Sequence, residues 1–140
     1  MTTRDLIHNI KAVKGFTAAS ISVTQTGDTI DLAGYESCTF LLSTGTGSLS
    51  TSNYWTAKLQ HGDASDLSDA VDVPAANVMG AMGSDADNKL DSSNDSSTTH
   101  KLGYIGGKRY VRIVLTLTGT MTQVMGCEAL LGNPRHAPVL

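Results

Sequence analysis

Charged residues are scarce in this chain, and so are aromatic residues. Aspartate, glutamate, lysine and arginine together make up 16% of the 140 residues, and the formal net charge is -3. Nucleic acids and membranes recruit proteins through clustered positive charge, so this composition argues against both as partners. Aromatic residues make up 5%, and Trp55 is the single tryptophan, which argues against an aromatic carbohydrate-binding groove.

Long apolar runs are also missing. No stretch approaches the roughly 18 residues that a membrane-spanning helix needs. Residues 1–15 carry charged side chains where a signal peptide would have a continuous apolar segment, so we expect synthesis and folding in the cytosol. Only two cysteines are present, Cys38 and Cys127, each inside an apolar run. A reducing compartment favours buried free thiols; a bridge between two sheets is the alternative.

What the chain does contain is apolar–polar alternation with a period of two, the pattern of a strand with one buried face. Three segments show it clearly and predict inward-facing sets: Cys38, Phe40 and Leu42 within 37–43; Trp55, Ala57 and Leu59 within 54–61; Val111, Ile113, Leu115 and Leu117 within 110–118. Further strands are predicted at 20–26, 29–32, 77–83, 100–105 and 121–131.

Glycine-containing turn signals separate these segments. The turn at 118–120 joins two long predicted strands through very few residues, which predicts a hairpin. Many short strands with almost no helical periodicity indicate an all-β sandwich or barrel. We expect a single β-sandwich of the jelly-roll type.

Three segments fit this core poorly. Residues 1–19 contain Leu6, Ile7 and Ile10 but lack the length of an independent helix, so they predict an extended N-terminal arm. Residues 134–140 contain two prolines, and Pro134 predicts that the last strand has ended. The sandwich is therefore expected over 20–133. Within it, the Ser- and Asp-rich stretch 83–100 predicts a long, mobile, exposed loop of unknown role.

The stretch GYIGGKRYVRIVLTLT at 103–118 places basic residues beside glycines. A phosphate-binding loop needs a glycine at position 102 and a serine or threonine at 109, but these are leucine and arginine, and a strand follows instead of a helix. The glycines fit a tight strand entry. Lys108, Arg109 and Arg112 then form a local basic patch, either solvated or paired with an acidic partner.

Other catalytic and metal-binding patterns are lacking. The aspartates at 63, 66, 69 and 72 are spaced three apart, and Lys89 occupies a position after Asp85 that a calcium-binding loop reserves for a ligand. The four histidines have no paired spacing, and neither Cys-x-x-Cys nor Gly-x-Ser-x-Gly occurs. We expect no catalytic, cofactor or metal site and a protein that is not an enzyme.

Five segments together resemble a known group of proteins: RDLIHNIKAV (4–13), IDLAGYESCTFLLSTGTG (30–47), WTAKLQHGDASDLSDAVDVPAANVMG (55–80), LGYIGGKRYVRIVLTLTG (102–119) and LLGNPRHAPV (130–139). The chain is similar, nearly end to end, to small structural proteins encoded in the head gene cluster of tailed bacteriophages. The most specific parts are the block Gly-Tyr-Ile-Gly-x-Lys-Arg-Tyr-Val-Arg and the tail Gly-Asn-Pro-Arg. The stretch 84–99 is richer in serine and aspartate than the resemblance leads one to expect.

The resemblance implies a capsid decoration, or cement, protein on the virion surface, made in the bacterial cytoplasm and bound to the major capsid protein. Self-association as a dimer or trimer is expected, with the symmetry, the copy number, the shell position and the host left open. The expected contact residues are Leu6, Ile7, Ile10, Lys108, Arg109, Arg112, Pro134 and Arg135. A head–tail connector or tail component is the alternative. A glycan-binding module that uses Trp55 or an exposed tyrosine is a second alternative.

Overall fold

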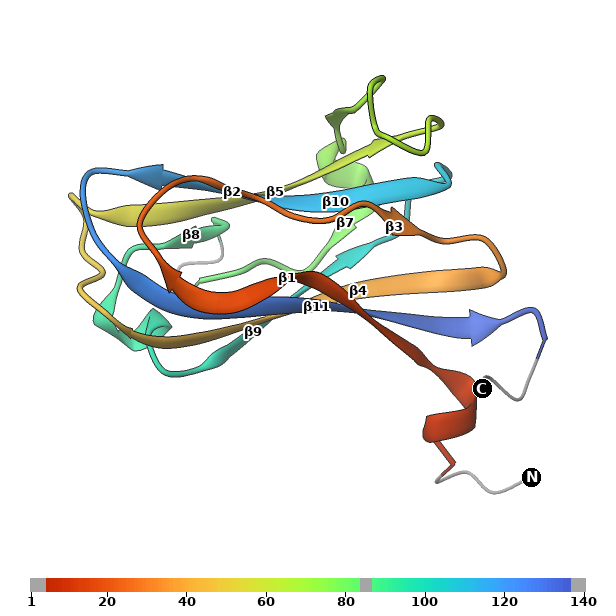
Figure 1. The fold of residues 1–140 in the computed structure, drawn as a ribbon, viewed down its shortest axis with the longest axis horizontal. Helices are drawn as coiled ribbons and strands as arrows, with labels where there is room; N and C mark the ends of the chain where they lie inside the picture. The colour runs from red at the N-terminus through yellow and green to blue at the C-terminus, as the bar shows by residue number, and fades with distance from the viewer. Residues whose placement is uncertain (1–4, 84–86, 137–140) are drawn as a thin grey trace.

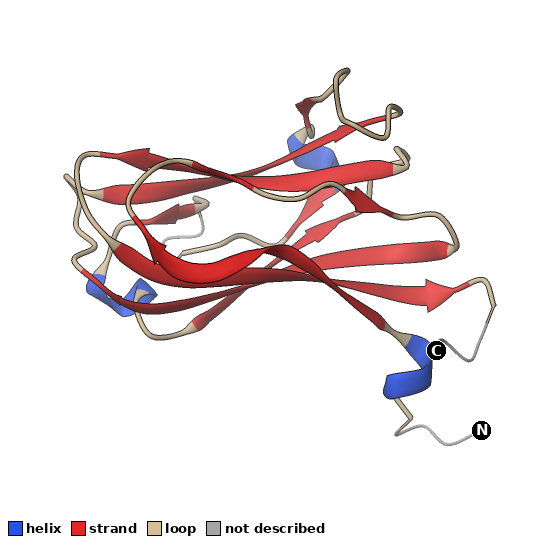
Figure 2. Cartoon of the chain, viewed as in Figure 1, coloured by secondary structure: helices blue, strands red, loops and turns tan. Residues whose placement is uncertain are grey.

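The computed structural model describes residues 5–83 and 87–136, and it is a sandwich of two antiparallel sheets (Figures 1 and 2). Sheet A has the strand order β1 (Lys11–Ile21), β11 (Gln123–Pro134), β4 (Tyr35–Gly47), β9 (Thr99–Tyr104) and β7 (Val78–Met79). Sheet B has the order β2 (Gln25–Thr26), β10 (Tyr110–Thr118), β5 (Tyr54–Gly62) and β6 (Val71–Asp72). In sheet B, β3 (Ile30–Asp31) also pairs with β10, and β8 (Lys89–Leu90) pairs with β5. Three short 3-10 turns complete the described residues: η1 (Ile7–Asn9), η2 (Ala75–Asn77) and η3 (Ser93–Asp95).

The strand order is that of a jelly roll. If β2 and β3 are counted as one interrupted strand, sheet A begins β1-β11-β4-β9 and sheet B reads β2/β3-β10-β5-β6. The chain therefore crosses between the two sheets at almost every connection, as in a double Greek key. The predicted all-β sandwich is confirmed.

The predicted hairpin at 118–120 is wrong. β10 pairs with β5 in sheet B, whereas β11 pairs with β1 and β4 in sheet A. The short turn therefore carries the chain across the sandwich. A short Gly-containing link can join two strands of one sheet, or it can carry the chain from one sheet to the other. The length of the link alone does not decide between these two arrangements.

The core lies between the sheets and is formed by the alternating residues that the sequence marks as inward-facing. Phe40 and Leu42 from β4 pack opposite the side of sheet B that carries Trp55, Ile113 and Leu115, and all are fully buried. Trp55 is therefore a core residue and is not available as a ligand platform. Apolar burial at roughly 25 cal/mol per Å² is the main stabilising contribution of such a core.

The expected boundary of the N-terminal arm is wrong. Residues 11–19 lie within β1, which pairs with β11 from Lys11 opposite Leu131 to Ile21 opposite Gln123. Of the expected arm, only residues 5–10 are described outside a strand, and residues 1–4 lie outside the described part. Alternation in β1 is interrupted by two β-bulges, which explains why the sequence pattern of this strand is hard to recognise.

The expected C-terminal boundary of the sandwich, residue 133, also differs from the structure. Pro134 is the last residue of β11 and pairs with Tyr35 of β4. A proline is tolerated there because β1 has already ended opposite Leu131, so the strand has one neighbour at this point. Residues 137–140 of the expected tail lie outside the described residues.

The stretch 83–100 is not a long exposed loop. Apart from residues 84–86, which lie outside the described part, it contains β8, η3 and the start of β9. Leu90 is fully buried opposite Trp55, and Asp95 is 1% exposed. The polar side chains of this segment suggest disorder in the sequence, but in the structure they fix its conformation through hydrogen bonds. The Asp95 carboxylate accepts hydrogen bonds from the backbone N–H groups of Asp91 and Ser92, at 3.2 and 3.1 Å.

Candidate interaction surface

Seven of the eight expected contact residues lie at one end of the sandwich. The loop before β10 carries Lys108 and Arg109, and the end of β11 carries Pro134 and Arg135. Leu6 and Ile7 precede β1 at the same end, where the first turn projects beyond sheet A (Figure 1). Ile10 joins this turn to β1, whereas Arg112 lies inside β10. We call this end, with residues 5–10, 31–36, 104–109 and 134–136, the arm end.

The N-terminal turn presents apolar side chains to solvent. Leu6 is 64% exposed and Ile7 is 76% exposed. Asp5 stabilises the turn: its carboxylate accepts hydrogen bonds from the backbone N–H of His8 at 3.3 Å and from His8 Nδ1 at 2.9 Å. These bonds from His8 lower the pKa of Asp5 below its usual value. Leu6 and Ile7 are thus adjacent exposed apolar residues on a turn that is held by hydrogen bonds.

The cations of the expected basic patch are already paired within the chain, and so is Arg135 at the end of β11. Lys108 Nζ lies 2.7 Å from Asp63, and Arg135 Nε lies 2.6 Å from Glu36. Arg109 binds Asp31 through both Nε and Nη2, at 2.9 and 3.0 Å.

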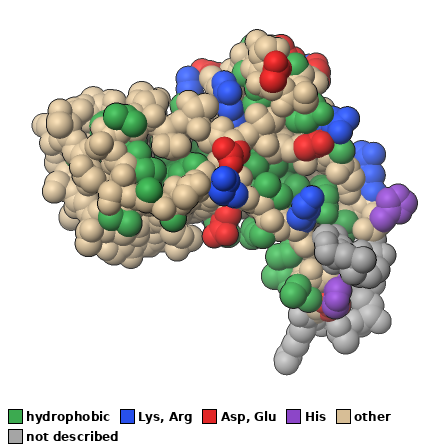
Figure 3. Space-filling view, viewed as in Figure 1, with side chains coloured by type: hydrophobic (Ala, Val, Ile, Leu, Met, Phe, Trp, Pro, Cys, Tyr) green, Lys and Arg blue, Asp and Glu red, His purple; other side chains and the backbone are tan. Residues whose placement is uncertain are grey.

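Arg112 is also occupied, because its guanidinium donates twice to Gln60 Oε1 on the adjacent strand. Arg109 and Arg112 are therefore not a free positive surface. At the arm end, acids and bases alternate, and Figure 3 shows charged side chains gathered toward this half of the molecule.

A hollow of about 380 Å³ lies between these ion pairs. It is lined by residues 32–38 and 106–109 together with Tyr104 and Arg135. Tyr104 is buried; its hydroxyl oxygen accepts the backbone N–H of Lys108 at 3.0 Å and lies 2.8 Å from His61 Nδ1. Burial raises the pKa of Tyr104, so the phenol stays protonated. The Tyr104 hydroxyl thereby holds the loop before β10 in place.

The two thiols are buried and free, as the sequence reading preferred. Burial raises the pKa of both Cys38 and Cys127 to about 12. A thiol is nucleophilic as the thiolate, so neither cysteine is reactive near neutral pH. Both thiols act as small apolar core residues.

The aspartates between β5 and β6 shape their own loop. Asp69 accepts the backbone N–H of Asp63 at 2.8 Å and that of Ala64 at 3.2 Å, and these bonds lower the pKa of Asp69. Asp66 accepts the N–H of Ser68. Within residues 5–83 and 87–136, no group of three or more histidine, cysteine, aspartate or glutamate side chains could hold a metal ion.

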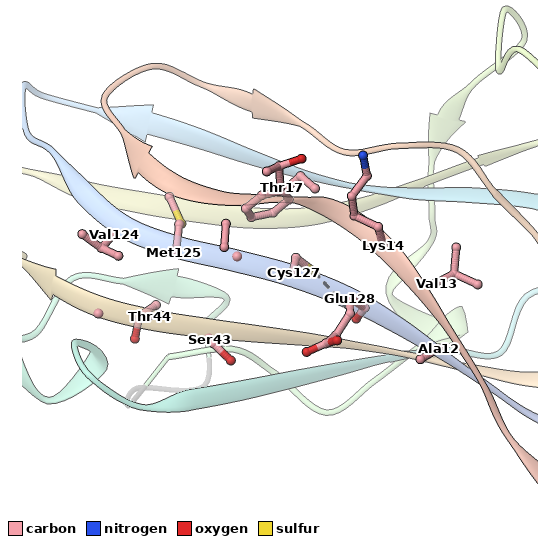
Figure 4. Close-up of a pocket in the computed structure, with 14 residues that line it drawn as sticks. Ala12, Val13, Lys14, Thr17, Ser43, Thr44, Val124, Met125, Cys127 and Glu128 are labelled. Atoms are coloured by element: carbon pink, nitrogen blue, oxygen red, sulfur yellow. Dashed lines mark hydrogen bonds between the residues drawn. The ribbon is translucent and has the colours of Figure 1, made fainter. Parts of the chain in front are cut away.

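Sequence reasoning missed a second surface, the outer face of sheet A. A shallow, mostly apolar hollow of about 610 Å³ lies there, over the bulged part of β1 and the neighbouring β11 and β4 (Figure 4). Ser43, Gly45, Ala18 and Gly126 are among its lining residues. The sequence signal for this hollow is a set of small residues at the outward-facing positions of two predicted strands. Small residues are ordinary at solvent-facing positions, so the hollow becomes evident only when the strands are placed side by side.

Comparison with known proteins adds no assignment. No protein-family model matches the chain, and no curated protein matches it. In the residues described, no helix has the length and apolar character needed to cross a bilayer.

Proposed function

We propose that this protein is a decoration protein of a tailed-bacteriophage capsid, which binds the major capsid protein shell without covalent bonds and stabilises it. The observation that carries the proposal is the arm end. There, exposed Leu6 and Ile7 lie at the same end of the sandwich as the ion pairs Arg109–Asp31 and Arg135–Glu36. An apolar anchor with a polar rim is the usual anatomy of a protein interface.

Two further considerations support the proposal. The resemblance of the 103–112 block and the 132–135 tail to phage head proteins falls on the segments that line the arm end. Jelly rolls are common in viral capsid and lectin domains, although this is an analogy at the level of fold. A protein repeated over a shell gains by multivalency, so modest contacts at each copy add up to firm attachment.

The test is binding to shells assembled from the major capsid protein encoded beside this chain. The double variant Leu6→Asp/Ile7→Asp should lose at least about 2 kcal/mol of binding, because two apolar anchors become charged. Co-sedimentation with shells measures the effect. Val23→Asp is the matched control: Val23 is 66% exposed and follows β1 at the opposite end of the sandwich, so binding should be unchanged. Equal binding by all three proteins would refute the role of the arm end.

A truncation completes the experiment. Removing residues 2–10 leaves β1 intact, whereas a cut at residue 14 would remove strand residues paired with β11 from Leu131 to Glu128. The shorter chain should stay folded by circular dichroism and fail to bind. The connector alternative is separated by copy number in the virion, hundreds of copies for a shell protein against roughly a dozen or fewer for a ring at the neck.

A further inference from the structure

The loop between β9 and β10 carries the chain from sheet A to sheet B and borders the hollow at the arm end (Figure 1). We call residues 105–109, Ile-Gly-Gly-Lys-Arg, the strap. No side chain of the strap is buried: Ile105 is 56% exposed, and Lys108 and Arg109 are also exposed. The strap is therefore held by polar contacts and not by buried apolar side chains.

The two ends of the strap are tied to opposite sheets. The N–H of Ile105 donates to the carbonyl oxygen of Asn77, which precedes β7 in sheet A, at 2.9 Å. The carbonyl oxygen of Arg109 accepts the N–H of Leu32, which follows β3 in sheet B, at 2.9 Å. These bonds fix the ends and leave residues 106–108, the middle of the strap, to be held by other contacts.

The middle of the strap rests on a buried phenol. The hydroxyl oxygen of Tyr104 accepts the N–H of Lys108 at 3.0 Å. Gly106 lies against the same phenol, because a Cβ at this position would lie 2.5 Å from the hydroxyl oxygen and 2.6 Å from two ring carbons. A glycine is needed for so close an approach of backbone and ring.

The phenol is fixed from both sheets. Tyr104 belongs to β9 in sheet A, and its hydroxyl oxygen lies 2.8 Å from Nδ1 of His61, a buried residue of β5 in sheet B. The two rings meet edge to face, with centroids 5.6 Å apart. The position of the hydroxyl therefore does not depend on the strap, whereas the position of the strap depends on the hydroxyl.

The contacts that hold the middle of the strap are few. Lys108 Nζ lies 2.7 Å from Asp63, but both side chains are exposed, and exposed ion pairs contribute little to stability. The bond to Tyr104 is made at a buried acceptor, so it is the stronger of the two contacts. Segments with exposed side chains and few buried contacts open at a free energy below that of global unfolding.

We propose that the strap opens locally over the arm-end hollow while the sandwich stays folded, and that the Tyr104 hydroxyl holds it closed. Opening moves residues 106–108 away from the phenol, separates Lys108 from Asp63 and enlarges the hollow. The strap is a property of the free chain, so the inference does not depend on the proposed function.

The first test is hydrogen exchange of the full chain, followed residue by residue by NMR. The reporter is the amide of Lys108, and the reference is the amide of Phe40 in β4, a strand paired on both sides. Urea below the unfolding transition should accelerate exchange at Phe40, because global unfolding exposes a large surface, and should leave the rate at Lys108 unchanged. An unprotected Lys108 amide, or a Lys108 rate that rises with urea in parallel with Phe40, overturns the proposal.

The second test concerns the hydroxyl. Tyr104→Phe keeps the ring and removes the acceptor, so the protection factor of the Lys108 amide should fall at least about fivefold. Gly106→Ala should have a similar effect, because the new methyl group collides with the phenol. Gly107→Ala is the matched control: no atom lies within 4 Å of a Cβ there, so protection should stay within about twofold of wild type.

Two results of the second test would overturn the role of the hydroxyl. One is equal protection of Lys108 in wild type and in Tyr104→Phe, and the other is an equal effect of the two alanine variants. The Phe40 rate, measured in each variant, separates release of the strap from loss of the fold.

Discussion

Asp95 is a single residue that organises a whole segment. Its carboxylate closes a capping box with Ser92, whose Oγ accepts the N–H of Asn94. Its backbone carbonyl oxygen accepts a hydrogen bond from Thr44 Oγ1 at 2.6 Å, which ties η3 to the middle of sheet A. A buried carboxylate that satisfies several donors is stabilising, because each donor left unpaired costs free energy.

Asp95→Ala should therefore lower the free energy of unfolding by about 2 kcal/mol, since the N–H groups of Asp91 and Ser92 lose their acceptor. Urea denaturation followed by Trp55 fluorescence measures the change. Ser93→Ala, an exposed position in the same turn, is the control and should alter stability little. A similar small effect for both variants would mean that solvent replaces the capping box.

Asp31 gives a prediction about pH. Its two hydrogen bonds to Arg109 lower its pKa below 3.8 in the folded protein. A lowered carboxyl pKa stabilises the fold above the unfolded-state pKa, and this contribution is lost as the pH falls through the folded value. The stability difference between wild type and Asp31→Asn should be present at neutral pH and shrink below pH 3.8. Thermal unfolding at several pH values measures it; a difference that stays constant with pH would exclude an ionic origin.

At the scale of elements, the connections that cross between the sheets decide the fold. The link between β10 and β11 turns through Gly119, which has a φ of +86°. The next residue, Thr120, donates its N–H to Asn53 Oδ1 at 2.9 Å, so this crossing is tied to the residues that enter β5. A β-carbon at Gly119 would collide with the carbonyl oxygen of Ser52 and the side chain of Asn53.

Gly119→Ala should consequently destabilise the protein by about 2 kcal/mol or more, from both the left-handed backbone and the collision. Gly107→Ala is the matched control, because Gly107 has open space around it and no positive φ. That variant should be neutral within about 0.5 kcal/mol. Chemical denaturation compares the two; equal stability would show that the crossing relaxes without cost.

The two sheets differ in how their edge strands are protected. The edge of β5 is covered by β6 and β8, and Ala57 donates its N–H to the carbonyl oxygen of Asn88 at 2.8 Å. The edge of β1 is long, yet its bulges and lysines disfavour addition of another strand. Addition of a strand from another chain is therefore disfavoured at both edges.

At the scale of the molecule, two surfaces differ in character. The arm end combines exposed Leu6 and Ile7 with ion pairs, which suits a polar-rimmed contact with a different protein. The outer face of sheet A carries the shallow, mostly apolar hollow of about 610 Å³, whose lining includes Lys14 and Glu128.

Much of the sandwich is legible in the linear chain, because the direction of a side chain in a strand depends only on whether its position is odd or even. Phe40, Trp55 and Ile113 are assigned to the core on that basis, and they are buried. The N-terminal segment is anticipated only in part: the sequence predicts an extended arm over residues 1–19, whereas residues 11–19 lie in β1 and Ile7–Asn9 form a 3-10 turn. The hydrogen bonds of Asp95 are not anticipated, because composition carries no information about which donors a carboxylate will meet.

The features that the sequence does not predict depend on which strands become neighbours in the folded sheets. Pairing of Leu130 with Thr39, and of Thr39 with Gly103, joins residues far apart in the chain on one face of sheet A. The bond between Arg109 and Asp31 likewise requires β3 to lie on β10. Such long-range pairings result from the simultaneous burial of both inner faces, and local propensities do not encode them. The alternation of apolar and polar residues thus specifies which side chains each strand buries. The pairing of strands in the assembled sheets decides which residues meet on the outer surface.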